Sequence, residues 1–281
     1  MKFHITLIWL LSQVTAGNED YKSIGKIIFG SCNEVQEFGL WSLMSSFSFD
    51  KLILLGDNMY ADSQVSDLYH KPATVNELKD QYEKLFSDPD YKKVISQLGG
   101  LEQVFAIYDD HDYGADNSDK TYVHKNQSLN LFNEYFRSKN VNSKTPLDGV
   151  YASFSFNLKN LNIKVVLLDT RFNKSPKSEW ETGDFLGENQ WVWLEKELND
   201  IVPDVIILGS SIQILPDDKL LEEYWGKFPL ARERLFHLVL NSPNNNIFLI
   251  SGDVHYAEFS QVGIIFKKLI YYDNCMFFLF F

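Results

Sequence analysis

The sequence predicts an α/β fold. Short, wholly apolar runs alternate along the chain with stretches whose apolar residues recur at helical spacing, and one pair of runs is separated by a polar turn. Apolar runs of this length, bounded by polar residues, are typical of buried strands, and their alternation with helices is typical of α/β domains. Strands are expected at 26–30, 51–55, 104–108, 150–156, 163–168, 205–208 and 247–250. The polar turn at 157–162 predicts a hairpin, so one sheet gains an antiparallel element.

Helices are expected between these strands. Thr74 and Glu77 have the spacing of a capping box, and apolar residues recur at helical spacing from Leu78 to Phe86. Pro229 fits the first turn of a later helix. The remaining helices are expected at 40–46, 126–137, 187–198 and 228–240.

Composition limits the classes of protein. The 281 residues are enough for one large core or two modest ones, and 45% hydrophobic residues with 15% aromatic residues indicate a globular chain. The formal net charge of −12 and the absence of a Lys/Arg cluster argue against nucleic-acid binding by phosphate neutralisation. An acidic chain that handles phosphate must supply positive charge locally, from metal ions or single arginines.

The N-terminal residues have the features of a targeting segment. Lys2 precedes a short apolar run, and small residues stand at 14–16 before a cleavage point after Ala16. Residues 1–16 are therefore predicted to be a secretory signal peptide, which places the mature protein outside the cell or in the secretory lumen. The alternative is a buried N-terminal strand. No later run reaches the roughly 20 apolar residues of a membrane helix, so no transmembrane span is expected.

Polar and titratable residues follow most of the predicted strands. In open α/β sheets, ligands bind at the carboxyl ends of the strands, so these residues are expected to meet in one cleft. They are Cys32, Asp57, Tyr60, Asp109, Asp110, His111, Asp112, Asp169, Arg171, Asp253 and His255.

The acidic run at 109–112 is the densest of these groups. Three carboxylates and an imidazole repel or crowd one another unless a counter-charge is present, and a metal ion is the simplest one; an acidic surface turn is the alternative. Asp57 and Asp110 offer hard oxygen ligands, while His255 and a Cys32 thiolate offer softer ones. Two metals roughly 3.5–4 Å apart can clamp a phosphate and activate a bridging water.

Cys32, Tyr60 and Arg171 each have a functional and an ordinary interpretation. Cys32 and Tyr60 together favour a trivalent ion such as Fe³⁺ at one metal position, but each is also a common packing residue. His111 could act as general acid toward the leaving oxygen. Arg171 offers a planar fork for phosphoryl oxygens, or is a surface charge. Packing or surface roles are predicted for Asp62, His70, His124 and His237.

In combination and order, the strand-end motifs resemble the PhoD-like metallophosphatases, the alkaline phosphatase D family of the calcineurin-like metallophosphoesterases. The resemblance covers a domain predicted at 25–265. It rests on SC at 31–32, GDNMYAD at 56–62, YDDHDYG at 108–114, LDTR at 168–171, LGENQWVWLEKEL at 186–198 and SGDVHYAEF at 251–259.

The resemblance implies a four-layer α-β-β-α sandwich of two mixed sheets and a secreted phosphoesterase that hydrolyses phosphate mono- or diesters with a dimetal-activated water. Asp57 would bridge two metal ions, Fe³⁺ with Ca²⁺ or Zn²⁺ or Mn²⁺ in their place, and Asp109 and Asp112 would support the ligands. The implied metal ligands are Cys32, Asp57, Tyr60, Asp110, Asp253 and His255, and the implied catalytic residues are His111 and Arg171.

The C-terminus departs from the family pattern. Relatives continue well past the Gly-Asp-x-His strand, whereas residues 266–281 match no family segment, so we expect a domain truncated at this end with an atypical tail. This motivates an alternative: a metal- or carbohydrate-binding secreted module that keeps the fold but is catalytically impaired. A nuclease or phospholipase of the same superfamily would differ only in substrate. The sequence predicts a small phosphate ester as substrate and leaves the oligomeric state open.

Overall fold

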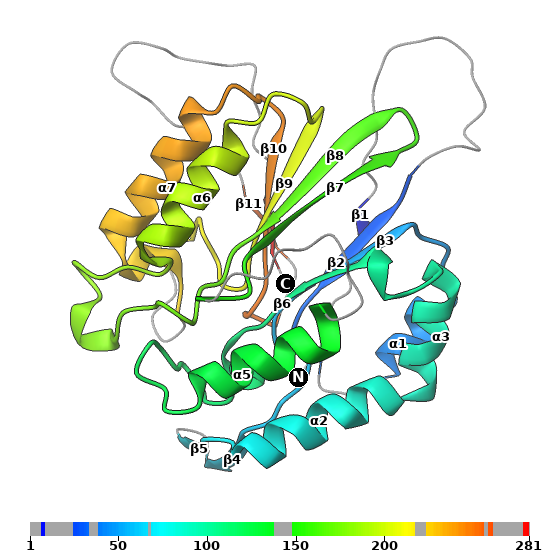
Figure 1. Ribbon diagram of the computed structural model, residues 1–281, viewed down its shortest axis with the longest axis vertical. Coiled ribbons are helices and arrows are strands. Elements are labelled where there is room, and N and C mark those ends of the chain that lie inside the picture. Colours follow the sequence, from blue (N-terminus) through cyan, green and yellow to red (C-terminus); the bar gives the residue numbers. More distant parts are fainter. Residues whose placement is uncertain are drawn as a thin grey trace.

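The computed structural model describes residues 7–8, 25–33, 39–66, 69–137, 148–216, 223–255, 258–260 and 278–280. Two β-sheets pack face to face, and helices lie on the outer side of each sheet (Figure 1). The predicted α/β class is confirmed, and the architecture is the α-β-β-α sandwich that the motifs implied.

The first sheet has four strands in the order β1-β2-β3-β6. They are β1 (Leu7–Ile8), β2 (Ile27–Gly30), β3 (Lys51–Leu55) and β6 (Val104–Ile107). β2, β3 and β6 run parallel, and β1 pairs antiparallel to β2. β1 falls within the predicted signal peptide, whose other residues lie outside those described.

The second sheet has six strands in the order β11-β12-β10-β9-β8-β7. They are β7 (Ala152–Leu158), β8 (Leu161–Leu167), β9 (Val205–Ser210), β10 (Ile247–Ser251), β11 (Glu258–Ser260) and β12 (Phe278–Phe280). β8, β9, β10 and β12 are parallel neighbours, whereas β7 and β11 pair antiparallel. The predicted hairpin is confirmed as β7–β8. Within the tail at 266–281, only β12 belongs to the described residues.

Successive side chains along β8 point to opposite faces of the second sheet and so pack against different layers. Val165 and Leu167 belong to the core that both sheets share, whereas Val166 packs with α6 (Gly187–Leu198) and α7 (Pro229–Asn241). Helices α6 and α7 therefore cover the outer face of the second sheet (Figure 1). The helices on the other side are α1 (Leu40–Met44), α2 (Val75–Ser87), α3 (Pro89–Leu98) and α5 (Lys125–Phe132).

The two sheets approach closely near the strand ends. Phe105 of β6 stacks on Phe154 of β7, with ring centroids 4.4 Å apart. A Cβ added to Gly209 of β9 would lie 2.9 Å from Leu55 Cδ2 of β3. Because a contact below 3.0 Å forces a shift, Gly209 lets the sheets meet just below the ends of their central strands.

Several local features refine the predictions. The capping box at Thr74 is present, with Thr74 and Glu77 bonding to each other's backbone N–H. In place of the single helix expected at 126–137, α5 is followed directly by a π-helical turn at 133–137.

The sequence patterns did not predict α3, the one-turn α4 (Asp110–Tyr113), or the hairpin of β4 (Ser63–Ser66) and β5 (Tyr69–Lys71). Short 3₁₀ turns occupy Leu101–Gln103, Lys177–Glu179 and Trp225–Lys227. No helix in the described ranges has both the length and the apolar character to cross a membrane.

Candidate metal centre

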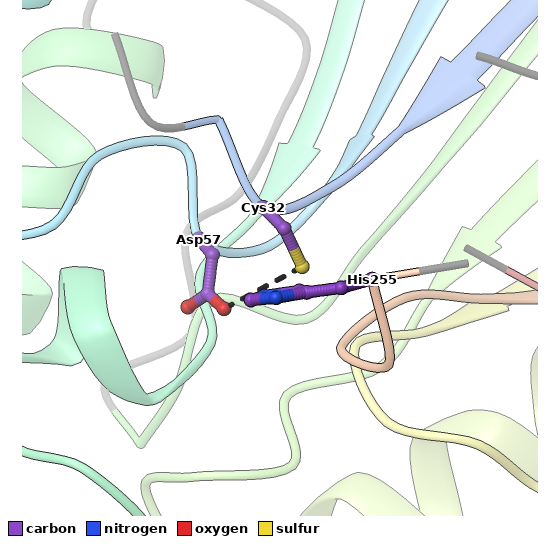
Figure 2. Close-up of side chains that lie close together, drawn as sticks. All are labelled: Cys32, Asp57 and His255. Carbon is purple, nitrogen blue, oxygen red and sulfur yellow. Dashed lines mark hydrogen bonds between the residues drawn. The ribbon is translucent and has the colours of Figure 1, made fainter. Parts of the chain in front are cut away.

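The predicted ligands lie in the segments that directly follow strands of both sheets. Cys32 follows β2, Asp57 follows β3, Asp110 follows β6, and Asp253 and His255 follow β10. Figure 2 shows Cys32, Asp57 and His255 reaching toward one another from three loops. The segments that the sequence separates by more than 200 residues therefore meet at one point between the sheets.

Asp57 is at the centre of this cluster. Its carboxylate oxygen Oδ2 lies 3.8 Å from Cys32 Sγ. Potential ligand atoms lie within 4.8 Å of one another in three overlapping groups that all contain Asp57: Cys32, Asp57 and His255; Asp57, Asp110 and His111; and Asp57, Asp109, Asp110 and Asp253. A carboxylate shared by neighbouring ligand groups is what a dinuclear centre needs as its bridge.

Backbone strain is concentrated at these residues. Six non-glycine residues in the described ranges have positive φ, and four of them are Cys32 at 57°, Asp57 at 47°, Asp253 at 81° and His255 at 53°. Left-handed backbone is uncommon for such residues and is retained mainly where function requires it. The preceding Gly56 has no room for a Cβ, which would lie 2.5 Å from Asp109 Cβ.

Cys32 and Asp57 have no lysine or arginine partner among the described residues that would stabilise their charged forms. Burial raises the pKa of Cys32 and of Asp57 well above their usual values, and neighbouring carboxylates add to the effect. Buried carboxylates, a thiol and an imidazole are ligands that suit a pair of metal cations, which would hold the acidic groups ionised.

Tyr60 lies at the edge of the same cluster. Its hydroxyl is 3.1 Å from His255 Nε2, and its ring lies against that of His111 with centroids 4.3 Å apart. Burial, followed by the charges of Cys32 and Asp57, raises the pKa of the Tyr60 phenol. The structure thus places this predicted ligand beside the others, and its role as an iron ligand stays a prediction.

His111 is held by an acidic partner that the sequence interpretation assigned to packing or the surface. His111 Nδ1 lies 2.6 Å from Oδ1 of the buried Asp62. Burial opposes the charged imidazole, but Asp110, Asp57 and Asp62 outweigh it and raise the pKa of His111 to about 11. The surface alternative for Asp62 was therefore wrong, and its buried carboxylate holds the ring of His111.

Arg171 is buried behind the ligands. Its Nε donates to Asp109 Oδ1 at 2.5 Å and its Nη1 to Glu223 Oε2 at 2.5 Å. Its Nη2 lies 3.7 Å from Asp110 Oδ1 and has no hydrogen-bond partner among the described residues. The alternative of a surface charge was wrong, since the side chain is fully buried. Contact with phosphate stays a prediction.

Two further residues extend this buried charge network, and neither stood out in the sequence. Lys174, which is fully buried, donates to Glu223 and to the backbone oxygen of Asn117. The N–H of Asn117 in turn donates to Asp110 Oδ2 at 2.7 Å. Lys174 and Glu223 therefore help to fix the loop that holds Asp110.

Asp112 organises the backbone around the bridge. Its carboxylate accepts hydrogen bonds from the backbone N–H groups of Asp57, Asn58 and Asp109. Burial raises the pKa of Asp112 to about 8, although these N–H donors act in the opposite direction by stabilising the charged form. The alternative of an acidic surface turn at 109–112 was wrong, because all three aspartates are buried.

The two mixed sheets, with their outer helices and the ligand cluster at the strand ends, define a metallophosphoesterase-like fold. The family model of the PhoD-like phosphatases matches residues 27–269. The chain belongs to this family. No curated protein sequence matches the chain.

Solved structures agree on the fold. A structure of PhoD superposes with a TM-score of 0.64 at 16% identity, covering 92% of this chain and 59% of that one. Purple acid phosphatase PPD1 from yellow lupin gives 0.56 at 12% identity, with 91% and 43% covered. GAP50, the anchor in the inner membrane complex of Plasmodium, gives 0.50 at 12% identity, with 90% and 70% covered. The chain therefore spans about 59% of the length of the PhoD structure.

Proposed function

We propose that this protein is a secreted, metal-dependent phosphoesterase that hydrolyses small phosphate mono- or diesters with a water activated by two metal ions. One observation carries the proposal: Asp57 belongs to every ligand group of the buried cluster at the strand ends. Membership of the PhoD-like phosphatase family supports the reaction class.

The position of each site residue indicates its role. Cys32 and His255 would hold one ion and Asp110 and Asp253 the other, with Asp57 between them. The bound metals would lower the pKa of a water and neutralise charge on the phosphoryl oxygens. Because Asp62 engages His111 Nδ1, Nε2 is the nitrogen left to protonate the leaving oxygen. Arg171 acts on the site by holding Asp109 and facing Asp110.

For the metals we propose Fe³⁺ with Ca²⁺, and Zn²⁺ or Mn²⁺ as substitutes. The nearness of Cys32, Tyr60 and His255 supports a trivalent ion on that side, because thiolate and phenolate ligands stabilise it. The carboxylates on the other side suit a hard divalent ion. Elemental analysis of protein purified without added metal tests this assignment, and protein that retains neither iron nor calcium would contradict it.

Phosphate release from an aryl phosphate ester tests the activity. The full chain is assayed before chelation, after exhaustive chelation, and after metal is restored. We expect turnover to disappear on chelation and return with metal. Asp57→Asn should lower turnover by more than about 100-fold, the upper end of what even outer-shell changes cost a metal enzyme. The matched control is Asp80→Asn, which changes an exposed carboxylate on α2.

The outcomes separate the competing functions. Full turnover after complete metal removal would contradict the metal-dependent mechanism. Folded, metal-loaded protein without turnover on phosphate monoesters or diesters would contradict the enzyme proposal and support the binding module. Secretion is tested separately by expressing the chain from its first residue in a secretory host and sequencing the N-terminus of the product, which should begin at Gly17.

A further inference from the structure

A second set of metal-ligating side chains lies beside the candidate dinuclear centre. Asp62 stands directly before β4, His70 lies on β5 of the same hairpin, and His111 lies on α4. One ligand atom from each lies within 4.8 Å of the other two. This cluster uses none of Cys32, Asp57, Asp110, Asp253 or His255, so an ion could occupy it while the dinuclear centre is filled.

The distances within the cluster suit a small ion. Asp62 presents one oxygen to each imidazole, with His111 Nδ1 at 2.6 Å from Oδ1 and His70 Nδ1 at 3.2 Å from Oδ2. Ligands placed 2.0–2.1 Å from a tetrahedral zinc ion lie roughly 3.3 Å from one another. The two distances from Asp62 lie near this value, and one ligand nitrogen of His70 lies within 4.8 Å of one of His111.

His70 supplies an independent sign of a missing ligand. Its Nδ1 atom is shielded from solvent and faces Asp62, yet it makes no hydrogen bond of acceptable direction. A buried ring nitrogen without a hydrogen-bond partner is unusual in native structures. The Asp62 side chain is 0% exposed, that of His111 12% and that of His70 22%, so the hairpin side of the cluster is open to an ion from solvent.

We propose that Asp62, His70 and His111 form a third metal site, separate from the dinuclear centre, that takes Zn²⁺ or a similar borderline divalent cation. Two imidazoles and one carboxylate form a ligand set that zinc uses, with a fourth position left to water. Calcium and magnesium prefer oxygen ligands and are disfavoured here. Binding to Nδ1 displaces the His111 proton to solvent and replaces the hydrogen bond to Asp62.

The consequence for activity rests on the proposed function. With zinc on Nδ1, His111 keeps only its Nε2 proton, and losing that proton would create an imidazolate. Such a group is a much weaker acid than an imidazolium, so it cannot protonate a leaving oxygen efficiently. The third ion is therefore inhibitory: excess zinc should slow an enzyme whose dinuclear centre is already loaded.

Zinc stoichiometry tests the site without relying on catalysis. The full chain, His70→Asn and His237→Asn are dialysed to equilibrium against the same excess of Zn²⁺, and bound zinc is measured by elemental analysis. Asparagine at 70 keeps a polar side chain beside Asp62 but removes the imidazole that would bind zinc. His237 is exposed on α7, away from the cluster. We expect His70→Asn to bind one equivalent less than the other two proteins, with an unchanged melting temperature before zinc is added.

Inhibition is then measured on the metal-loaded proteins. The zinc concentration that halves phosphate release should rise at least about tenfold in His70→Asn, because even outer-shell changes cost a metal site 10–100-fold in affinity. Equal zinc equivalents in wild type and His70→Asn would overturn the proposal. So would equal sensitivity to zinc in an active pair of proteins. Wild type that binds the extra equivalent but never releases phosphate would contradict the proposed function and leave the third site supported.

Discussion

The buried acidic groups at the strand ends fall into two sets that differ in what balances their charge. On one side, Asp109 and Glu223 form ion pairs with Arg171, and Glu223 also contacts Lys174. On the other side, Asp57 and Cys32 have no such partner among the described lysines and arginines. The first set is part of a permanent framework, and the second is the set that metal ions would complete.

Protein cations and metal ions therefore have separate tasks. Arg171 is a permanent cation beside Asp109 and Glu223, so its ion pairs do not depend on bound metal. The unpaired set is costly on its own because burial disfavours charge. Substitutions in one set should therefore change stability without metal, and substitutions in the other should change the stabilisation that metal provides.

The largest effect on stability is expected for Arg171→Met. The change leaves Asp109 and Glu223 as buried charges without their guanidinium partner, and breaking such a pair costs about 3–5 kcal/mol. Urea denaturation of the metal-free protein measures the loss. Arg171→Lys keeps the positive charge but lacks the planar guanidinium, so this variant should recover only part of the lost stability. A loss in Arg171→Met below about 1 kcal/mol, the range of exposed pairs, would show that the framework is not held by these charges.

The next largest effect is expected for the stabilisation that metal binding at Cys32 and Asp57 provides. Metal at 100 times its dissociation constant should stabilise the wild-type protein by about 2.7 kcal/mol, because it binds only the folded state. Asp57→Asn removes the bridge, so the same metal should stabilise that variant far less, and without metal it should be no less stable than wild type. Thermal unfolding with and without metal measures both quantities. Equal stabilisation of the two proteins by metal would remove Asp57 from the centre.

These two sets also differ in how visible they are in the sequence. The sheets and the positions of Cys32, Asp57 and His255 could be predicted, because each follows an apolar run whose carboxyl end must lie at one edge of a sheet. Where each strand stops is a local property, and parallel strands bring these ends together. The confirmed strands and the capping box at Thr74 have the same local origin.

Two framework residues, Glu223 and Lys174, could not be found in this way, whereas Asp109 and Arg171 follow predicted strands. Glu223 and Lys174 lie in irregular segments without a periodic pattern, and only the packing of the loops brings their charges to Arg171. Asp62 is part of a motif, but its partner His111 is 49 residues away and no local rule pairs them. The hairpin that carries His70 has mostly polar strands, so it lacks the alternation that identifies a strand.

A smaller loss is expected for Asp112→Asn. Asp112 accepts N–H groups from Asp57, Asn58 and Asp109, and an amide can replace only one carboxylate oxygen as acceptor. The donors left facing the new NH₂ group lose their partner, which costs about 1–3 kcal/mol. Urea denaturation of the metal-free variant measures this loss, and metal affinity should fall with it because the Asp57 backbone is no longer fixed. Wild-type stability would mean that the chain holds its left-handed turn at Asp57 without Asp112.

The smallest effect is expected at an ion pair with good geometry but no burial. Arg234 donates from Nη1 and Nη2 to the two oxygens of Glu188, at 2.8 and 2.9 Å, and both side chains are exposed. Solvent and salt screen this pair, whereas they do not reach the ion pairs of Arg171. Glu188→Gln should therefore leave the melting temperature and phosphate release unchanged at physiological salt. If this variant lost as much stability as Arg171→Met, the number of ion pairs rather than their burial would govern stability, and the distinction between a buried framework and a metal-completed cluster would fail.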